Sequence, residues 1–387
     1  MTEPAAEWIR DLFKEKFDEK SREIGRFNVA IFGKPGAGKT TLLNVIFGRD
    51  VAATGVGRPV TQDKQLYKHD DGHLGVLDTP GLEIGNDTKA IIADLEEYMD
   101  KTRHGALEDQ IHVAWYCVMS MGRRFEDTEA EFIGALRRLG FPVLIVLTQV
   151  PKKDGQLHPA AEQLKAHIDE RGLASHRAPA FMTNAVEDLF DDNHPVHGLQ
   201  ELLDATFRVA PEGVRTALTV AQQIDMARKQ AEAHKAIAAA AALAGTAAAV
   251  PIPFADAVVL VPIQLAMMAS VAITFGVKFD RAAAASVAAT AAATVGGRAL
   301  VANLLMFVPG IGSIAGGAIS VAVATSFTWA MGQAWASVCD RLARGELQSV
   351  TGVLDNDAIR EAFMAEFRSR INLKKHLPGP ADQTPDH

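Results

Sequence analysis

The chain has 387 residues, and 48% of them are hydrophobic, so it can bury the cores of two or three domains. Its formal net charge is −8 and it has no long lysine and arginine run, so nothing in the charge balance indicates DNA or RNA binding as its primary role, and ribosomal or RNA partners stay open. Cys117 and Cys339 lie far apart in apolar sequence, a pattern typical of buried thiols in the reducing cytoplasm.

Residues 1–25 are expected to form an amphipathic helix. Charges of both signs alternate there with apolar residues that include Trp8, Phe13 and Phe17, so the segment lacks the uninterrupted apolar core of a signal peptide. We expect Trp8 and this helix to pack against the alanine-rich region near the end of the chain.

Residues 26–210 alternate short apolar strands with helical segments, which predicts an α/β domain with a mostly parallel sheet covered on both faces. The expected strands are Phe27–Phe32, Gln65–His69, His73–Leu77, Ile111–Met119, Val143–Leu147 and Ala180–Met182. The sequence HDDGH, between the second and third strands, is typical of a hairpin, so one edge of the sheet should be antiparallel. Ligands of such sheets bind beyond the carboxyl ends of the strands.

The stretch AIFGKPGAGKTTLLNVIFG begins at residue 30 and predicts a strand, a tight turn and a helix that bind a nucleotide phosphate. The glycines let backbone N–H groups converge on an anion, and the helix adds the positive end of its dipole. Lys39 is expected to reach the β- and γ-phosphate oxygens and Thr40 to give its hydroxyl to Mg²⁺. The predicted phosphate-binding residues are Gly33, Lys34, Pro35, Gly36, Ala37, Gly38, Lys39, Thr40 and Thr41.

Two further segments complete the expected magnesium and γ-phosphate site. In GVLDTPG a strand ends at Asp78, which is expected to support the Mg²⁺ ion, and the N–H of Gly81 is expected to contact the γ-phosphate. In GVGRPVTQD, Thr61 is expected to bring its hydroxyl to Mg²⁺ when a triphosphate is bound. The expected metal ligands are therefore Thr40, Thr61 and Asp78.

These motifs, in this order, resemble the GTPases of the Era-like and immunity-related groups over roughly residues 26–207. The resemblance implies a P-loop GTPase that binds GTP and GDP with Mg²⁺. It also implies that Thr148 and Gln149 hold the guanine. The last base-contacting loop would be formed by Thr183, Asn184 and Ala185.

The base-recognition motif departs from the family pattern. The family has Asn/Thr-Lys-x-Asp there, whereas this chain has Thr148-Gln149-Val150-Pro151, and proline cannot supply the usual carboxylate. Asp154, three residues further on, is a candidate replacement across the turn PKKDG. We favour guanine with weakened base discrimination, and an ATP-using P-loop protein is the alternative.

Hydrolysis is expected to be slow. Leu82 follows Gly81 at the position where the best-known switches place a glutamine that orients water. Arg123 and Arg124 precede a helix whose start is predicted from Thr128 and Glu131, spaced as a capping box. Either arginine could neutralise charge in the transition state, together with Lys39 and Thr61, or both could be solvated surface residues. A nucleotide-binding scaffold with little hydrolysis is the rival hypothesis.

Five histidines invite a metal interpretation, but their spacing does not suit shared ligation, so solvated loops are favoured. They are His158, His167, His176, His194 and His197.

The remainder of the chain predicts a second, all-α domain. We expect a linker helix over 211–235, an alanine- and glycine-rich helical domain over 236–345, a terminal helix over 346–373 and a disordered tail over 374–387. This half resembles a helical domain of unknown function that follows GTPase domains in many bacterial proteins and is sometimes described as membrane-associated.

The membrane question depends on two long uncharged runs in this domain. Residues 257–277 are long enough to span a bilayer, but Pro262 and Arg298 fall inside candidate spans, so a soluble bundle is favoured over permanent insertion. The expected function is a GTPase switch whose nucleotide state is coupled to this helical domain. Besides the guanine nucleotide, the partners left open are a lipid membrane, a second copy of the chain in a homodimer, and an unidentified effector protein.

Overall fold

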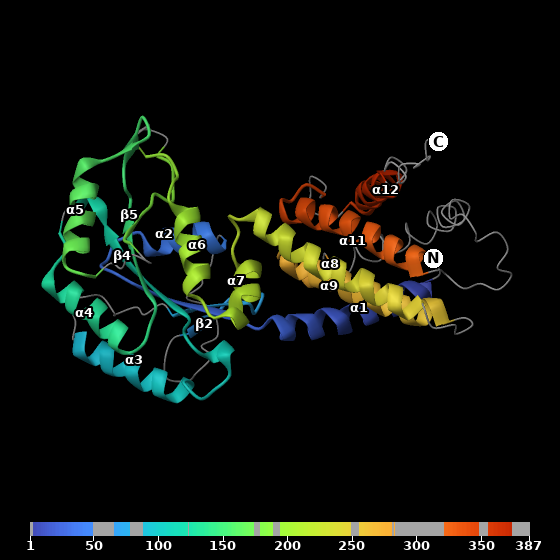
Figure 1. The fold of residues 1–387 in the computed structure, drawn as a ribbon, viewed down its shortest axis with the longest axis horizontal. Coiled ribbons are helices and arrows are strands. Elements are labelled where there is room, and N and C mark those ends of the chain that lie inside the picture. Colours follow the sequence, from blue (N-terminus) through green and yellow to red (C-terminus); the bar gives the residue numbers. More distant parts are fainter. Residues whose placement is uncertain are drawn as a thin grey trace, which may run out of the picture. The chain divides into compact units, whose positions relative to one another are not determined.

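The computed structural model describes residues 3–48, 66–77, 88–122, 124–173, 179–188, 194–248, 255–280, 282, 321–347 and 355–373. The chain divides into two compact units, one comprising residues 24–226 and the other residues 1–23 with 227–387. The first unit contains the sheet and the second is built from helices (Figure 1).

The first unit is organised around a six-stranded sheet with the strand order β2-β3-β1-β4-β5-β8. Its strands are β1 (Phe27–Phe32), β2 (Leu66–Lys68), β3 (Leu74–Leu77), β4 (Val113–Met119), β5 (Val143–Thr148) and β8 (Phe181–Met182). Strand β2 runs antiparallel to β3, and every other neighbouring pair is parallel. The predicted α/β fold with one antiparallel edge is therefore confirmed.

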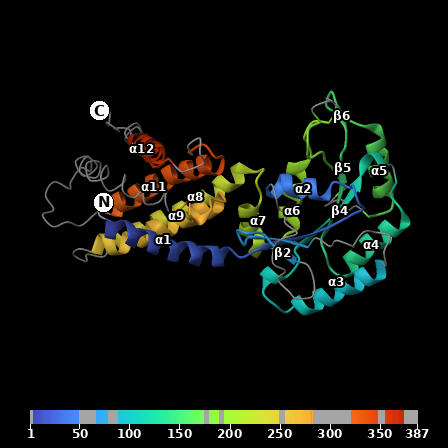
Figure 2. The same ribbon diagram turned by 180° about the vertical axis from the view of Figure 1, so that it is seen from behind.

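Helices cover both faces of this sheet because successive strand residues point to opposite sides. Along β1, Val29 and Ile31 join one hydrophobic core, whereas Ala30 and Phe32 join the other. The first core lies under α2 (Lys39–Phe47), α6 (Leu199–Val209) and α7 (Arg215–Ala221). The second lies under α3 (Thr88–Thr102), α4 (Asp127–Arg138) and α5 (Pro159–Glu170). Figure 2 shows β4 and β5 of this sheet between α6 and α5. Short 3-10 turns occur at η1 (Leu107–Asp109), η2 (Ser120–Gly122) and η3 (Glu212–Val214).

One element of this unit was not expected from the sequence. Strands β6 (Lys152–Lys153) and β7 (Gln156–Leu157) pair antiparallel as a separate two-stranded sheet after β5. Asp154 lies in the turn between them with a φ of 50°, followed by Gly155 with a φ of 81°. The residues that follow the base-recognition motif therefore form a hairpin.

The second unit contains α1 (Glu3–Ile24, of which residues 3–23 belong here), α8 (Met226–Ala248), α9 (Ala255–Thr274), α11 (Val321–Ala343) and α12 (Asn356–Leu373). Phe13 and Phe17 of α1 pack against Phe279, with ring centroids 6.2 and 5.5 Å away. The predicted packing of the N-terminal helix against the alanine-rich region is confirmed. Trp8 differs from the prediction, because 52% of its surface is exposed.

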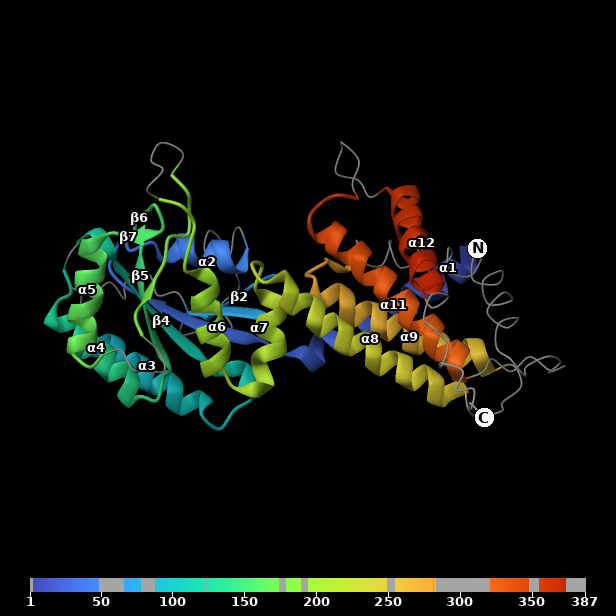
Figure 3. The ribbon, with the colours of Figure 1, turned by 45° about the horizontal axis from the view of Figure 1, so that its top comes forward.

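Small residues bring the helices of the second unit close together, and Figure 3 shows α8, α9 and α11 side by side. A Cβ added at Gly332 of α11 would lie 2.7 Å from a side-chain carbon of Ile237 in α8. Trp335 of α11 is fully buried, and its Nε1 donates to the backbone oxygen of Met268 in α9 at 2.8 Å. Lys229 of α8 is also buried and donates to the backbone oxygen of Thr274 at 3.0 Å.

The connection between the two units is not the single linker helix expected over 211–235. Helix α7 ends at Ala221 and α8 begins at Met226. The side-chain oxygen of Gln222 accepts the backbone N–H groups of Ile224 and Asp225 at 2.9 and 2.7 Å, which stabilises the break.

None of the described helices combines the length and apolar character that a membrane crossing requires. The expected tail, residues 374–387, lies outside the described residues. Cys117 and Cys339 are both free and buried, as their apolar sequence context predicted. Burial raises the pKa of Cys117 to about 12, so its thiol stays protonated at neutral pH.

Candidate nucleotide-binding site

The predicted phosphate loop connects the end of β1 to the start of α2. Gly33, Gly36 and Gly38 adopt φ values of 138°, 76° and 74°, which residues with a side chain rarely reach. A Cβ at Gly33 would lie 2.3 Å from the backbone oxygen of Cys117. Glycine is therefore required at residue 33 both for its backbone angle and for the close approach of β4.

The ammonium group of Lys39 is held over this loop. Its Nζ donates to the backbone oxygens of Gly33 at 2.8 Å and Lys34 at 3.0 Å. Lys39 is also the first residue of α2, so its charge lies close to the positive end of that helix. The loop therefore concentrates positive potential where a phosphate group would bind.

The last residue of β5 and the residue after it contact the phosphate loop. The Thr148 hydroxyl donates to the backbone oxygen of Ala37 at 2.8 Å, and the Gln149 Nε2 donates to that of Gly36 at 3.0 Å. These are the two side chains that the family resemblance assigned to the guanine. In this structure their donor groups tie the base-recognition loop to the phosphate loop.

Lys34 anchors the phosphate loop to α4. Its Nζ lies 2.9 Å from a carboxylate oxygen of Glu126 and 3.1 Å from one of Glu129. Partial burial opposes the charge of Lys34, but these two hydrogen bonds outweigh it and raise the pKa of the lysine. Glu129 is itself buried and accepts a hydrogen bond from the Tyr116 hydroxyl at 3.2 Å, so the anchor is fixed to the sheet.

The start of α4 differs from the prediction. The helix begins at Asp127, and the capping box is formed by Glu126 and Glu129 rather than by Thr128 and Glu131. The predicted capping pair was wrong because Glu129 is held by three interactions at once. Its carboxylate accepts hydrogen bonds from the Glu126 N–H, from Lys34 and from the Tyr116 hydroxyl. Arg124, which precedes the helix, is exposed.

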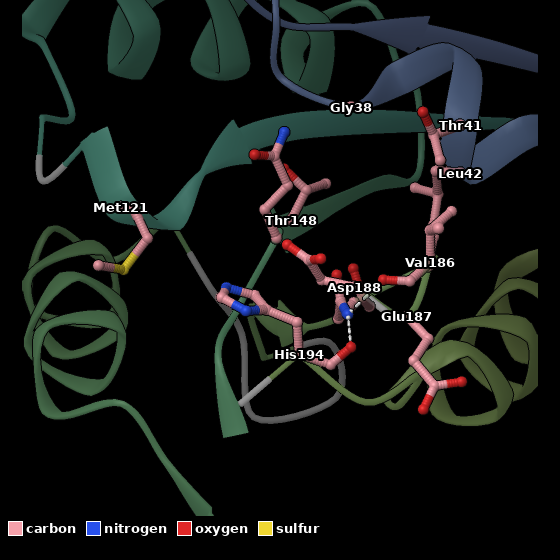
Figure 4. A pocket seen from close by; sticks show the side chains of 13 residues that line it. Gly38, Thr41, Leu42, Met121, Thr148, Val186, Glu187, Asp188 and His194 are labelled. Carbon is pink, nitrogen blue, oxygen red and sulfur yellow. Dashed lines mark hydrogen bonds between the residues drawn. The ribbon is translucent and has the colours of Figure 1, made fainter. Parts of the chain in front are cut away.

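Beside the phosphate loop lies a pocket of about 540 Å³, bounded by α2, η2, the end of β5 and the loop after β8 (Figure 4). It brings together seven of the predicted residues: Gly38, Thr41, Thr148, Gln149, Thr183, Asn184 and Ala185. The sequence did not predict its other lining residues, which are Leu42, Met121, Val186, Glu187, Asp188 and His194.

The side chain of Asn184 organises the loop after β8. Its Nδ2 lies within donor distance of the backbone oxygens of Val186, His194 and Pro195, at 2.7, 2.8 and 3.1 Å. Asn184 is 5% exposed, so this amide is committed to the loop. The residues that this loop presents to the pocket include Asp188 and His194, which no motif marked.

Asp154 lines a neighbouring pocket of about 710 Å³, together with Pro151 and the β6–β7 hairpin. Met121 and His194 border both pockets, but Asp154 is not among the residues that line the pocket beside the phosphate loop. Asp154, the candidate replacement for the missing carboxylate, therefore lines a different pocket from the one beside the phosphate loop.

Four predicted site residues, Thr61, Asp78, Gly81 and Arg123, lie outside the described residues. Thr40 is exposed in the first turn of α2, and its hydroxyl is the kind of oxygen ligand that Mg²⁺ prefers. Among the described residues no group of three His, Cys, Asp or Glu side chains could hold a metal ion. Of the three predicted Mg²⁺ ligands, only Thr40 is therefore among the described residues.

Comparison with known proteins agrees with this geometry. The family described as 50S ribosome-binding GTPase matches residues 28–149. GTPase Era of Lactobacillus delbrueckii subsp. bulgaricus is 32% identical over 133 residues, which cover 34% of this chain and 40% of that protein. GTPase Era of Stenotrophomonas maltophilia is 30% identical over 204 residues, which cover 49% of this chain and 65% of that protein.

Among solved structures, a "probable GTP-binding protein engB" is similar at 16% identity and a TM-score of 0.32, over 47% of this chain and 97% of that one. For the two Era proteins, the matched regions make up 40% and 65% of their length, so this chain spans less than two thirds of either. The matched family, the order of the strands and the phosphate loop agree with one another. The chain therefore contains a P-loop GTPase domain that is similar to the corresponding part of the Era GTPases, together with a helical unit.

Proposed function

We propose that this protein is a Mg²⁺-dependent switch that binds GTP and GDP and hydrolyses GTP slowly. The observation that carries the proposal is the phosphate loop, in which three left-handed glycines, Lys39 and the start of α2 converge beside a pocket of nucleoside size. The similarity to Era GTPases over the same part of the chain supports guanine as the base.

When bound, Mg²⁺ would supply positive charge against the negative charge that develops on the γ-phosphoryl group during transfer. Thr40, Thr61 and Asp78 are the proposed ligands. Lys39 would stabilise the same charge from the phosphate loop. Arg123 and Arg124 are the proposed additional cations, and the absence of a glutamine after Gly81 in the sequence supports slow intrinsic turnover.

Chain connectivity supports coupling between the nucleotide and the helical unit. Helix α1 ends at Ile24, β1 begins at Phe27, and β1 leads directly into the phosphate loop. A change of the loop on hydrolysis can therefore reach α1 through a single strand. The proposed setting is the cytoplasm, and a lipid surface, a second copy of the chain and an effector protein are the proposed partners.

The test uses purified full-length protein with fluorescent GTP, GDP and ATP, in Mg²⁺ or in EDTA, and measures phosphate release. We expect GTP and GDP to bind more tightly than ATP, EDTA to weaken triphosphate binding, and phosphate release to be slow. Tight GTP binding without release would favour the scaffold hypothesis, which Leu82 in the sequence supports. Equal binding of ATP would contradict the guanine assignment.

A further inference from the structure

The pocket beside the phosphate loop needs a group that reads the edge of the base. Guanine presents two donors there, N1–H and the N2 amino group, and a carboxylate can accept from both. Adenine presents an acceptor nitrogen at the equivalent place, which a carboxylate repels. Pro151 stands where the family supplies this carboxylate, so the discriminating group must come from elsewhere if guanine is preferred.

Most polar side chains of the pocket are committed to holding its walls. Thr148 and Gln149 donate to the phosphate loop. The Thr183 hydroxyl donates to the backbone oxygen of Leu147 at 3.1 Å, and the Asn184 amide holds its own loop. The carboxylates that line the pocket are those of Glu187 and Asp188.

Their orientations distinguish these two acids. Figure 4 shows the Asp188 carboxylate projecting into the pocket in front of Thr148, beside the ring of His194. The Glu187 side chain points away from this space in the same view. Asp188 is exposed, so its carboxylate can be reached by a ligand in the pocket.

Asp188 lies two residues after Val186, in a segment whose backbone is tied to the rest of the first unit. The Asn184 Nδ2 donates to the backbone oxygens of Val186 and His194 at 2.7 and 2.8 Å. The start of this loop is in turn joined to the residues after β5, since the Val150 N–H donates to the backbone oxygen of Thr183 at 3.1 Å. The start of this loop is therefore joined to the loop after β5, which also contacts the phosphate loop through Gln149.

We propose that Asp188 is the residue that recognises guanine, accepting hydrogen bonds from N1–H and the N2 amino group in place of the aspartate that the base-recognition motif lacks. This assignment rests on the proposed function as a GTP-binding protein. It transfers base recognition from the loop after β5 to the loop after β8.

The test is Asp188→Asn in the full-length chain, with GTP, xanthosine triphosphate (XTP) and ATP as probes. The NH₂ group of the new amide would meet the N2 amino group of guanine donor against donor. With xanthine, the same NH₂ group would donate a hydrogen bond to the O2 oxygen. We expect GTP affinity to fall roughly 10- to 100-fold and XTP affinity to rise, so that the order of preference is reversed. Competition by inorganic tripolyphosphate should be unchanged, which shows that the phosphate loop is intact.

Glu187→Gln and Asp154→Asn are the matched controls, and both should keep the wild-type ratio of GTP to XTP affinity. An Asp188→Asn protein with the wild-type ratio would overturn the proposal, and a changed ratio in Asp154→Asn alone would assign the role to Asp154. If the wild-type protein binds tripolyphosphate but no GTP, the guanine function itself fails, which is a separate result.

Discussion

At the scale of single residues, Lys39 is held by the backbone of the proposed phosphate loop. Its ammonium group is satisfied by the backbone oxygens of Gly33 and Lys34, at 2.8 and 3.0 Å. A bound phosphate would offer the lysine a full negative charge in exchange for two neutral acceptors. The loop keeps its shape through its glycines and through Thr148, so the lysine is not needed to build it.

We therefore expect Lys39→Ala to lose at least about tenfold in affinity for a non-hydrolysable GTP analogue, because a charge-assisted hydrogen bond contributes about 1.5 to 3 kcal/mol. The thermal transition should stay close to that of the wild type. Isothermal titration calorimetry measures the affinity. Lys101→Ala, at a surface ion pair with Glu97, is the control and should bind normally. Unchanged affinity in Lys39→Ala would refute the phosphate-loop assignment.

A second residue, His112, has a strongly constrained protonation state. Its Nδ1 accepts the Asn28 N–H at 2.8 Å, and its Nε2 lies 2.8 Å from the backbone oxygen of Leu107, an arrangement that only the neutral ring fits. Burial lowers the pKa of His112, the charge of Arg26 lowers it further, and the bond to Leu107 opposes both.

The pH dependence follows from this lowered pKa. Below about pH 6.5 the unfolded chain binds a proton at this histidine that the folded chain does not, so stability falls as the pH decreases. We expect the GTPase unit to lose up to about 1 kcal/mol between pH 7 and pH 5.5 from this group. Urea denaturation followed by circular dichroism measures the effect. The slope should flatten in His112→Gln and persist in His104→Gln, and equal slopes in both variants would contradict the assignment.

The individual site residues show what sequence can and cannot reveal. Glycines and Lys39 in the phosphate loop are recognisable because their backbone demands and spacing are local. The surroundings of Asp188 depend on hydrogen bonds from Asn184 to backbone oxygens as far along the chain as Pro195. No local sequence pattern encodes these bonds. His194 was interpreted as part of a solvated turn, yet it borders both pockets.

At the scale of elements, α1 joins the helical unit through one face only. Phe13 is fully buried and stacks on Phe279, whereas Trp8 on the same helix is 52% exposed. Folding therefore removes the Phe13 ring from water but leaves much of the Trp8 side chain exposed. The amphipathic pattern predicted the helix but could not decide which aromatic residue faces the core.

Phe13→Ala should therefore destabilise the helical unit by about 3 to 5 kcal/mol, because it removes a buried ring and leaves a cavity. Trp8→Ala should change stability by no more than about 0.5 kcal/mol, as expected for a solvated position. Guanidinium denaturation of the two variants and the wild type provides the comparison. Similar losses in both variants would mean that α1 packs through a different face.

Elements that local sequence determines were predicted well, whereas elements that depend on contacts between distant residues were not. The central strands of the main sheet were found from apolar runs, since β1, β3 and β5 are buried over their whole length and β4 is buried up to its last residue. The β6–β7 hairpin has only two residues in each strand and no apolar run to mark it. The start of α4 was misplaced because a contact with Lys34, distant in sequence, selects Glu129 as its capping residue.

At the scale of the whole molecule, two units share one chain, and the proposed switch requires that the state of one alters the other. The helical unit has apolar side chains both inside and at its surface. Leu265 and Met268 of α9 are buried, whereas Val259 of α9 and Trp329 of α11 are 39% and 38% exposed. Such residues could contribute to a lipid, protein or dimer contact once their neighbours move.

We expect the full-length chain to be extracted from membranes by alkaline carbonate, because Pro262 and the charge of Arg298 fall inside the long apolar runs of the helical unit. We also expect more protein to float with liposomes in the presence of a GTP analogue than with GDP, since the triphosphate state would change the packing of the helical unit. Sucrose-gradient flotation of protein with each nucleotide measures this. Lys39→Ala should show no nucleotide response.

Recovery only in the alkali-resistant fraction would contradict a reversible contact, and equal flotation with both nucleotides would separate lipid binding from the switch. Protein that never floats would direct the search to a second copy of the chain or to an effector protein.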